Sequence, residues 1–516
     1  MSSKQYTTTP IADIDRYVQT ARTAYLSNRT KPLEYRKTQL KKLFEALDDN
    51  LSVIQESLAK DFGKPGHEVY LTECLTLQGE IMEVLHDLPK WMKPRAGLAS
   101  FPFNLSRPQI FKEPLGVSLI IGAWNYPLFV TFGPLIGAIA AGCPAILKPS
   151  ELAPNCAMVM QEIIHRYLDN DCYRVVQGAI PETTHLLNEQ KWDSIFYTGG
   201  GAVGRIVAAA GAKNLTPVTL ELGGKNAVII TKNADLKLAA RRVAWGKFTN
   251  AGQTCVAPDY ILFTDPGLED KFTEEFRKQI ADFYPEESWR KPGTFTRIVN
   301  ENHFKRIKGL LDATSGQVVL GGHTDLSQRL IEPTLVGKCN FDDSLMTQEI
   351  FGPVLPMLQA KSLDDAISTL QHRDKSLALY VFTNQKSEYE KLFHTVQSGG
   401  AMINDTMAHC GLTGLPFGGV GESGTGAHGG AAGFDSFSHT RSIVKQPTWF
   451  EYVFASRYAP YTPSKIKQLK MIAPKKYWNK DYSETSFAMK LLRYILGLSF
   501  IFAAYRYIKP RLSAKI

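Results

Sequence analysis

The chain has 516 residues, of which 44% are hydrophobic and 21% are charged, an ordinary balance for a globular protein. This length exceeds one compact core, so we expect two or three domains. Residues 442–516 carry a net charge of +11 and the remainder carries −2, which together give +9. The near-neutral body argues against nucleic-acid binding, while the basic tail suits an anionic surface.

Seven cysteines occur singly along the chain, and no CxxC pair is present. This pattern argues against a zinc site or a disulfide framework, so no metal is expected. The thiols are expected to be reduced, and the protein is expected to face the cytosol. The first ten residues are polar and lack the apolar core of a signal peptide.

Residues 11–60 are predicted to be helical, because leucines recur there at three- to four-residue spacing. Short β-branched runs then alternate with helix-like segments, including a small-residue, apolar stretch at 133–142. The expected strands are 117–121, 145–147, 173–177, 194–198, 218–220, 227–230 and 380–382. This alternation predicts an α/β fold with a parallel, doubly wound sheet.

Residues 486–508 are a candidate membrane-anchor helix. The uncharged part, 494–505, would span only about 18 Å as a helix, against roughly 30 Å of hydrocarbon core. If Lys490, Arg493 and Arg506 reach the interface, the apolar span grows to roughly 30 Å. An amphipathic helix lying on the membrane surface is the alternative, and residues 443–485 are read as a basic connecting tail.

A cysteine and a carboxylate are the strongest candidates for chemistry. Cys255 ends a small-residue turn, and a helix opening at Val256 would favour its thiolate and donate to an oxyanion. Glu221 ends a predicted strand beside two glycines, where desolvation would raise its pKa and suit it to act as a general base. A buried ion pair with Lys225 is the alternative for Glu221.

A glycine-rich segment follows the strand predicted at 194–198. Gly199, Gly201 and Gly204 match the GxGxxG pattern of dinucleotide-binding turns. In that pattern Glu221 would hold a ribose, so the motif alone leaves both roles of Glu221 open. Beside a dinucleotide site, a thiol and a carboxylate base can oxidise an aldehyde to an acid through a thioester.

Polar residues also end or follow other predicted strands. Asn125 could donate its amide N–H to a developing oxyanion, or could only stabilise a turn. Lys148 and Glu151 could hold sugar hydroxyls. Glu349 and Phe351 pair a carboxylate with an aromatic face, which would suit a ribose.

In this order and spacing, the segments resemble the aldehyde dehydrogenase superfamily from about residue 30 to 442. Six motifs carry the resemblance: 124–127, 148–151, 198–204, 221–225, 252–255 and 349–353. Segments 256–260 and 437–439 are similar to the class 3 branch. With the apolar C-terminal stretch, the chain looks most like the membrane-anchored fatty aldehyde dehydrogenases of fungi.

The resemblance implies a role for each candidate residue. Cys255 would be the nucleophile, Glu221 the base, and Asn125 with the Cys255 backbone N–H the oxyanion hole. The residues that would bind NAD, or NADP, are Lys148 and Glu151 at the adenosine ribose, Glu349 and Phe351 at the nicotinamide ribose, and Gly199, Gly200 and Gly204 at the pyrophosphate. Gly200 and Gly201 replace polar side chains that are usual in the family, which would weaken the pyrophosphate contacts or leave them to the backbone.

The expected function is NAD(P)-dependent oxidation of aldehydes, preferably long-chain fatty aldehydes that dissolve in membranes. Aromatic aldehydes are an alternative, because Tyr126 or Phe129 would suit a ring, and His409 is placed at the substrate mouth or on the surface. An alternative of another class is a membrane-tethered scaffold without activity. A coenzyme A-acylating enzyme would not need Glu221 as a base.

The resemblance also implies a domain organisation. A Rossmann-like dinucleotide domain is expected at 1–80 and 106–226, and a catalytic α/β domain at 227–410. A bridging, oligomerisation element would combine 81–105 with 411–442, and a homodimer is expected. The tail would hold the enzyme on the mitochondrial outer membrane or the endoplasmic reticulum, with its body facing the cytosol.

Overall fold

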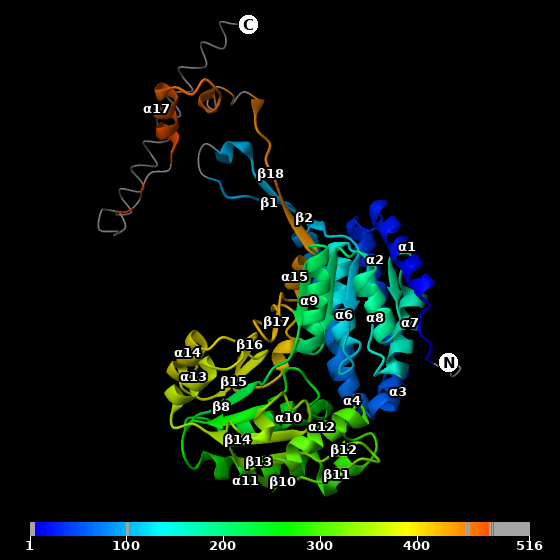
Figure 1. Cartoon of the computed structure of the whole chain (residues 1–516), viewed down its shortest axis with the longest axis vertical. Coiled ribbons are helices and arrows are strands. Elements are labelled where there is room, and N and C mark those ends of the chain that lie inside the picture. Colours follow the sequence, from blue (N-terminus) through cyan, green and yellow to red (C-terminus); the bar gives the residue numbers. More distant parts are fainter. Residues whose placement is uncertain are drawn as a thin grey trace. The chain divides into compact units, whose positions relative to one another are not determined.

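The computed structural model describes residues 6–99, 103–448, 451, 455–473, 476 and 478 (Figure 1). The chain forms two compact units, one of Met1–Pro94 with Phe111–Arg441 and one of Arg95–Ile110 with Ser442–Ile516. The predicted membrane anchor at 486–508 lies outside the described residues. Within the described residues, no helix has the length and apolar character needed to cross a bilayer.

A six-stranded sheet organises the first half of the larger unit. Its strand order is β17-β7-β6-β3-β4-β5, and only the β17–β7 pair is antiparallel. The strands are β3 (Ser118–Ile121), β4 (Ala145–Lys148), β5 (Tyr173–Val175), β6 (Ser194–Thr198), β7 (Val218–Glu221) and β17 (Gly424–Thr425). The strands predicted in this region, and the parallel α/β class, are thereby confirmed.

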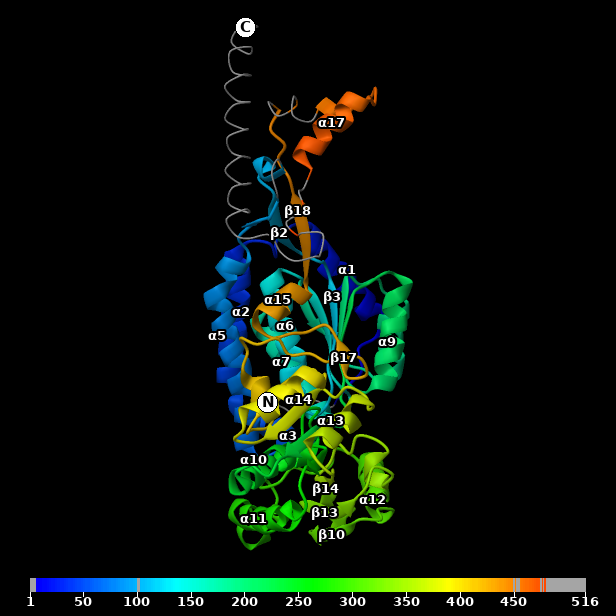
Figure 2. The same ribbon diagram turned by 90° about the vertical axis from the view of Figure 1, so that its left-hand side faces the viewer.

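Helices cover both faces of this sheet, because alternate strand residues point to opposite sides. Ile120 packs with one group of helices: α2 (Leu33–Asp49), α3 (Leu51–Phe62), α5 (Thr76–Trp91), α6 (Phe129–Ala141) and α7 (Pro154–Tyr167). Leu119 and Ile121 pack with the other: α1 (Ile11–Leu26), α8 (Ile180–Asn188) and α9 (Gly201–Lys213). Figure 2 shows α6 and α9 on opposite sides of β3. A short helix, α4 (Gly66–Val69), leads into a π-helix (Tyr70–Leu75) ahead of α5.

A seven-stranded sheet organises the second half of the same unit. Its order is β10-β13-β14-β9-β8-β15-β16, and only β10–β13 is antiparallel. The strands are β8 (Ala227–Ile230), β9 (Tyr260–Phe263), β10 (Gln317–Leu320), β13 (Thr334–Cys339), β14 (Val354–Gln359), β15 (Ala378–Phe382) and β16 (Gly400–Ile403). The helices of this half are α10 (Leu236–Phe248), α11 (Leu268–Phe283), α12 (Glu301–Asp312), α13 (Leu363–Gln371) and α14 (Lys386–Thr395).

Several smaller elements complete the described chain. The short strands are β1 (Arg95–Ala96), β2 (Gln109–Pro114), β11 (Thr324–Asp325), β12 (Leu330–Ile331) and β18 (Ser438–Ile443). The remaining helices are α15 (Gly430–Ser436) and α17 (Pro463–Ile472), with 3-10 turns at Phe103–Ser106, Thr249–Gly252, Pro285–Arg290, Ser344–Met346, Ala408–Gly411 and Ala455–Arg457.

The structure differs locally from what the sequence suggested. The condition named for a stabilised Cys255 thiolate, a helix opening at Val256, is not met, because the segment is a turn and no regular element begins before β9. The glycine-rich turn expected between Gly199 and Gly204 is shorter than predicted, because helix α9 already begins at Gly201. The predicted boundary between residues 80 and 81 falls inside α5, where Leu77 and Ile81 are both buried. The other predicted domain boundaries stay predictions.

Candidate active site

A cavity of about 260 Å³ lies where β6 and β7 end, and it holds the two residues singled out for chemistry. Cys255 and Glu221 both contribute to its wall. The full lining is Leu71, Thr72, Thr76, Tyr126, Phe129, Val130, Thr198, Glu221, Trp245, Thr254, Cys255, Val256, Met407, Ala408, Cys410, Gly411, Phe417 and His428. The carboxyl ends of parallel strands are where α/β proteins place their ligands.

The Glu221 carboxyl is buried at the end of β7 and is only 3% exposed. Neither of its oxygens has a hydrogen-bond partner among the described residues. Burial therefore raises the pKa of Glu221 well above the ordinary value of a glutamate. Lys225 is paired with Asp259 instead, so the predicted alternative of a Lys225–Glu221 ion pair is wrong.

The turn before Cys255 is strained. Asn250, Ala251 and Gly252 have φ angles of 55°, 52° and 71°, all in the left-handed region. A Cβ on Gly252 would lie 2.4 Å from the carbonyl oxygen of Gly352, so only glycine fits there. The strain at Ala251 persists because the surrounding contacts hold the turn in place.

Two amide side chains supply those contacts. Gln253 donates to the carbonyls of Asn250 and Arg297, both at 3.1 Å, and accepts from the Val299 N–H at 3.0 Å. Asn226 donates to the carbonyls of Cys255 at 2.8 Å and Ala257 at 3.0 Å. The position of the thiol is therefore fixed from both sides of Cys255.

The protonation of Cys255 differs from the expectation of a stabilised thiolate. The pKa of the Cys255 thiol is raised to about 12, first by burial and then by the neighbouring carboxyl groups of Glu349 and Glu221. The backbone N–H groups of Cys255 and Val256 lower this pKa, but by less. Without a helix after Cys255, these two groups are not reinforced by a helix dipole. The free protein therefore holds a thiol at neutral pH.

Asn125 lies beside the Cys255 turn and is 3% exposed. Its Nδ2 donates to the Gln253 carbonyl at 3.1 Å, and its own carbonyl accepts from Asn250 Nδ2 at 3.0 Å. The next residue, Tyr126, shares a hydrogen bond of 2.7 Å with Thr254. Asn125 and Cys255 are thus brought together, although Asn125 is not among the residues that line the cavity.

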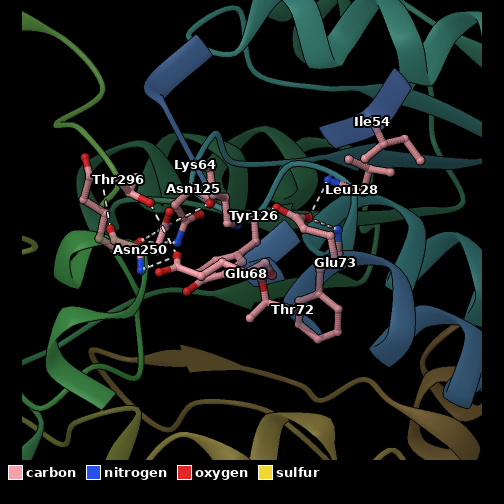
Figure 3. A network of polar contacts seen from close by, with 12 residues as sticks. Ile54, Lys64, Glu68, Thr72, Glu73, Asn125, Tyr126, Leu128, Asn250 and Thr296 are labelled. Atoms are coloured by element: carbon pink, nitrogen blue, oxygen red, sulfur yellow. Dashed lines mark hydrogen bonds and ion pairs between the residues drawn. The ribbon is translucent and has the colours of Figure 1, made fainter. Parts of the chain in front are cut away.

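A buried polar network beneath Asn125 was missed from the sequence (Figure 3). Lys64 and Glu73, both fully buried, form an ion pair of 2.9 Å. Glu73 also accepts from the backbone N–H groups of Leu128 and Phe129, at 3.1 and 3.0 Å. These bonds tie the π-helix, which carries Glu73, to the start of α6 just after Tyr126.

A second carboxylate of the network, Glu68, accepts from the backbone N–H of Asn250 at 3.0 Å (Figure 3). The Lys64 ammonium lies 3.9 Å from the centre of the Tyr126 ring, within cation–π range. Glu68 therefore holds the turn before Cys255, while Lys64 contacts the segment after Asn125.

The residues predicted to bind a cofactor follow other strand ends of the same unit. Lys148, the last residue of β4, donates to Glu151 at 2.9 Å. No atom lies within 4 Å of a Cβ built on Gly200, which precedes α9, so the N–H groups at this helix start are open to a phosphate. The Gly199 N–H donates to the Glu221 carbonyl at 3.0 Å, and a Cβ on Gly204 would lie 2.8 Å from Leu222.

Glu349 lies against the glycines that follow Glu221. A Cβ on Gly223 would come within 2.4 Å of the Glu349 carboxylate, so glycine makes this approach possible. Burial raises the pKa of Glu349 to about 8, helped by the charge of Asp259. The Phe351 ring stands edge-on to Trp124, with ring centres 5.5 Å apart. Together with the open start of α9, this donor set fits a dinucleotide.

An α/β fold with a cysteine and a buried carboxyl in one cavity is typical of enzymes that use a cysteine nucleophile with a separate base. The family model for the aldehyde dehydrogenase family matches residues 4–443. The chain belongs to the aldehyde dehydrogenase family.

Individual relatives cover most of the chain. It is 43% identical to the "Aldehyde dehydrogenase, dimeric NADP-preferring" of Rattus norvegicus, over 88% of this chain and 99% of the relative. It is 42% identical to a "Beta-apo-4'-carotenal oxygenase" of Neurospora crassa, over 91% of this chain and 87% of that relative. A solved structure of Staphylococcus aureus AldH in a substrate-bound state is 39% identical, with a TM-score of 0.84 over 89% of this chain and 99% of that one.

Proposed function

We propose that this chain oxidises aldehydes to carboxylic acids by way of an acyl group carried on Cys255. The observation that carries the proposal is one cavity whose wall contains both the Cys255 thiol and the unpartnered Glu221 carboxyl. A nucleophile and a separate base are the two groups that thioester formation and hydrolysis need. A scaffold without activity would have no use for an unpaired, buried carboxyl.

The protein's own residues act in sequence. The Cys255 thiol releases its proton to solvent, and the thiolate sulfur attacks the carbonyl carbon. Asn125 Nδ2 and the Cys255 backbone N–H then donate to the developing oxyanion. After oxidation has left a thioester, Glu221 takes a proton from the water that attacks the acyl carbon. The carboxylic acid leaves and the thiol is restored.

The cofactor of the reaction is NAD or NADP, in keeping with the family. When bound, it supplies the acceptor for the hydride that leaves the substrate carbon. We assign the adenosine ribose to Lys148 and Glu151, the pyrophosphate to Gly199, Gly200 and Gly204, and the nicotinamide ribose to Glu349 and Phe351. Glu221 is then left for base chemistry and not for a ribose.

Long, apolar aldehydes are the proposed substrates. The cavity wall is mostly apolar, and the Neurospora relative is named for a carotenal, an aldehyde with a long hydrocarbon chain. Aromatic aldehydes are the second candidate, because Tyr126, Phe129 and Phe417 line the same cavity. Competition between palmitaldehyde and benzaldehyde in one assay would separate them: fatty substrates predict the higher kcat/KM for palmitaldehyde.

We further propose, from the sequence of the tail, that residues 486–508 attach the enzyme to the mitochondrial outer membrane or the endoplasmic reticulum. Membrane fractionation of the full chain and of a chain ending at residue 485 tests this. Loss of membrane association on truncation is the expected result. A homodimer is also proposed, in line with the rat relative named dimeric, and sedimentation would detect it.

The nucleophile is tested with two cysteine variants. Cys255→Ala should abolish steady-state NAD(P)H formation with a long-chain aldehyde. Cys410→Ala removes a second thiol from the same cavity wall and should keep most of the turnover. Normal turnover by Cys255→Ala would refute the proposal.

A further inference from the structure

One polar side chain of the cavity has no part in the chemistry proposed above. His428 lines the cavity together with Cys255 and Glu221, and it is only 6% exposed. Its Nδ1 is closed off within the protein beside Gly133 of α6 and has no hydrogen-bond partner among the described residues. The other ring nitrogen, Nε2, is not enclosed in this way and makes no hydrogen bond among the described residues, so it is the nitrogen left for a ligand in the cavity.

Other polar side chains of the wall are satisfied within the protein. The hydroxyls of Tyr126 and Thr254 bond to each other at 2.7 Å. Thr72 donates to the Glu68 carbonyl at 2.7 Å, and Thr76 donates to the Leu71 carbonyl at 3.1 Å. Unlike these hydroxyls, the His428 side chain makes no hydrogen bond to another described residue.

The His428 imidazole is held in a fixed position. Its backbone exchanges two hydrogen bonds with Phe417, of 2.9 and 2.7 Å, in an antiparallel bridge. Its ring meets those of Phe417 at 5.3 Å, Phe196 at 5.4 Å and Phe129 at 6.3 Å between centres. The aromatic contacts fix the ring, so the Nε2 atom is held in one position.

The imidazole is also neutral. Burial lowers the pKa of His428 to about 4, so at physiological pH one ring nitrogen donates and the other accepts. A neutral imidazole suits an uncharged hydroxyl. It offers a carboxylate no charge to pair with, and an alkyl chain would leave its nitrogen unsatisfied.

We propose that His428 is a specificity-determining residue that hydrogen bonds to a hydroxyl group on the aldehyde, away from the reacting carbonyl. The preferred substrates are then hydroxylated aldehydes over their hydrocarbon counterparts. This proposal rests on the aldehyde oxidation proposed above. A site built to bond a hydroxyl discriminates against the analogue that lacks it, because the site's own polar group is left unpaired.

The test compares matched substrates that differ in one group. The pairs are the three hydroxybenzaldehydes with the corresponding methylbenzaldehydes, and ω-hydroxyalkanals of graded length with the corresponding alkanals. For each pair, the ratio of kcat/KM for the hydroxylated to the hydrocarbon member is measured in the full chain. At least one pair should give a ratio above one, and ratios at or below one in every pair would overturn the proposal without any variant.

Variants then assign the preference to the imidazole. His428→Phe should lower the favourable ratio about fivefold, within the range for one hydrogen bond, mainly through KM of the hydroxylated substrate. His428→Gln, which can still donate and accept, should restore part of it. His409→Phe is the matched control, because His409 packs against Phe417 at 6.0 Å but is not in the cavity wall, and it should leave the ratio unchanged.

Three results would contradict the inference in different ways. An unchanged ratio in His428→Phe, or an equal loss of kcat for both members of each pair, would refute the recognition role. A fall of the ratio in His409→Phe as large as in His428→Phe would also refute it. If the unaltered chain oxidises none of the aldehydes with NAD or NADP, the proposed function fails first, and the inference fails with it.

Discussion

Lys225 is ion-paired with Asp259, and this pairing leaves the nearby Glu221 carboxyl without a cation. The Lys225 ammonium also donates to the carbonyls of Leu345 at 2.8 Å and Gln348 at 2.9 Å, which occupies its remaining donors. Glu221 is therefore buried without compensation. The Glu221 carboxyl has no structural partner and lies in a cavity wall with a thiol. We infer that it is kept there for chemistry, at a cost in folding stability.

Stability should rise when the Glu221 carboxyl is removed. Its raised pKa means that the folded state holds the proton more tightly, so the free energy of unfolding falls as pH rises above the ordinary pKa of glutamate. Glu221→Gln cannot ionise and should unfold with about 1–3 kcal/mol more free energy at pH 8. Urea unfolding at pH 8 and pH 5 checks this, and an equal effect at both pH values would contradict it.

The alkylation rate of Cys255 in the free enzyme should depend steeply on pH. With a pKa of about 12, the thiolate fraction grows about tenfold for each pH unit between 7 and 9. The measurement is the rate of reaction with iodoacetamide, corrected with Cys255→Ala. A rate that is level across this range would mean that the thiolate is already formed, contrary to the structure.

The buried Lys64–Glu73 pair should matter for both folding and turnover. Glu73→Gln leaves Lys64 buried without its counter-ion and should cost about 3–5 kcal/mol of unfolding free energy. It should also lower kcat, because Glu73 holds the start of α6 next to Tyr126.

The control for this pair is Glu56→Gln, which breaks the exposed Glu56–Lys60 pair and should change stability far less than Glu73→Gln does, because solvent screens this pair. Chemical denaturation and steady-state assays on the two variants give the comparison. Equal effects of the two substitutions would show that the buried pair has no special role.

A methyl group on Gly252 should displace the nucleophile. Gly252 has a φ of 71°, and an added Cβ would meet the Gly352 carbonyl at 2.4 Å, so the turn that carries Cys255 must move. Gly252→Ala should lower kcat about 100-fold. Gly309→Ala adds a Cβ into open space within α12, outside the candidate site, and should keep kcat, so a comparable loss in both variants would refute the steric argument.

The sequence was a good guide to where the two proposed reacting groups lie, while their roles stay a proposal. Cys255 and Glu221 stand in motifs whose spacing is typical of the family, and both line one cavity. A helix opening at Val256 was only a condition for a stabilised thiolate. The sequence already argued against it, because Pro258 lies three residues after Cys255 and proline disfavours a helical residue before it.

Other features depend on contacts between distant segments. Lys64, Glu68 and Glu73 are three charged residues within ten positions, which by residue type alone would be expected to face solvent. Their burial arises only when the segments of Asn125 and Asn250 fold over them. The unpartnered state of Glu221 likewise depends on Asp259, which captures Lys225 from 34 residues further along the chain than that lysine. Contacts between segments so far apart in the chain cannot be read from a single sequence.

The central claim is that Cys255 carries an acyl group that Glu221 helps water to release. Stopped-flow recording of NAD(P)H formation by Glu221→Gln measures both halves of this claim in one trace. We predict a rapid burst approaching one equivalent per active site, followed by a steady rate at least about 100-fold below that of the unaltered chain. A linear trace without a burst, at a rate close to that of the unaltered chain, would contradict the account.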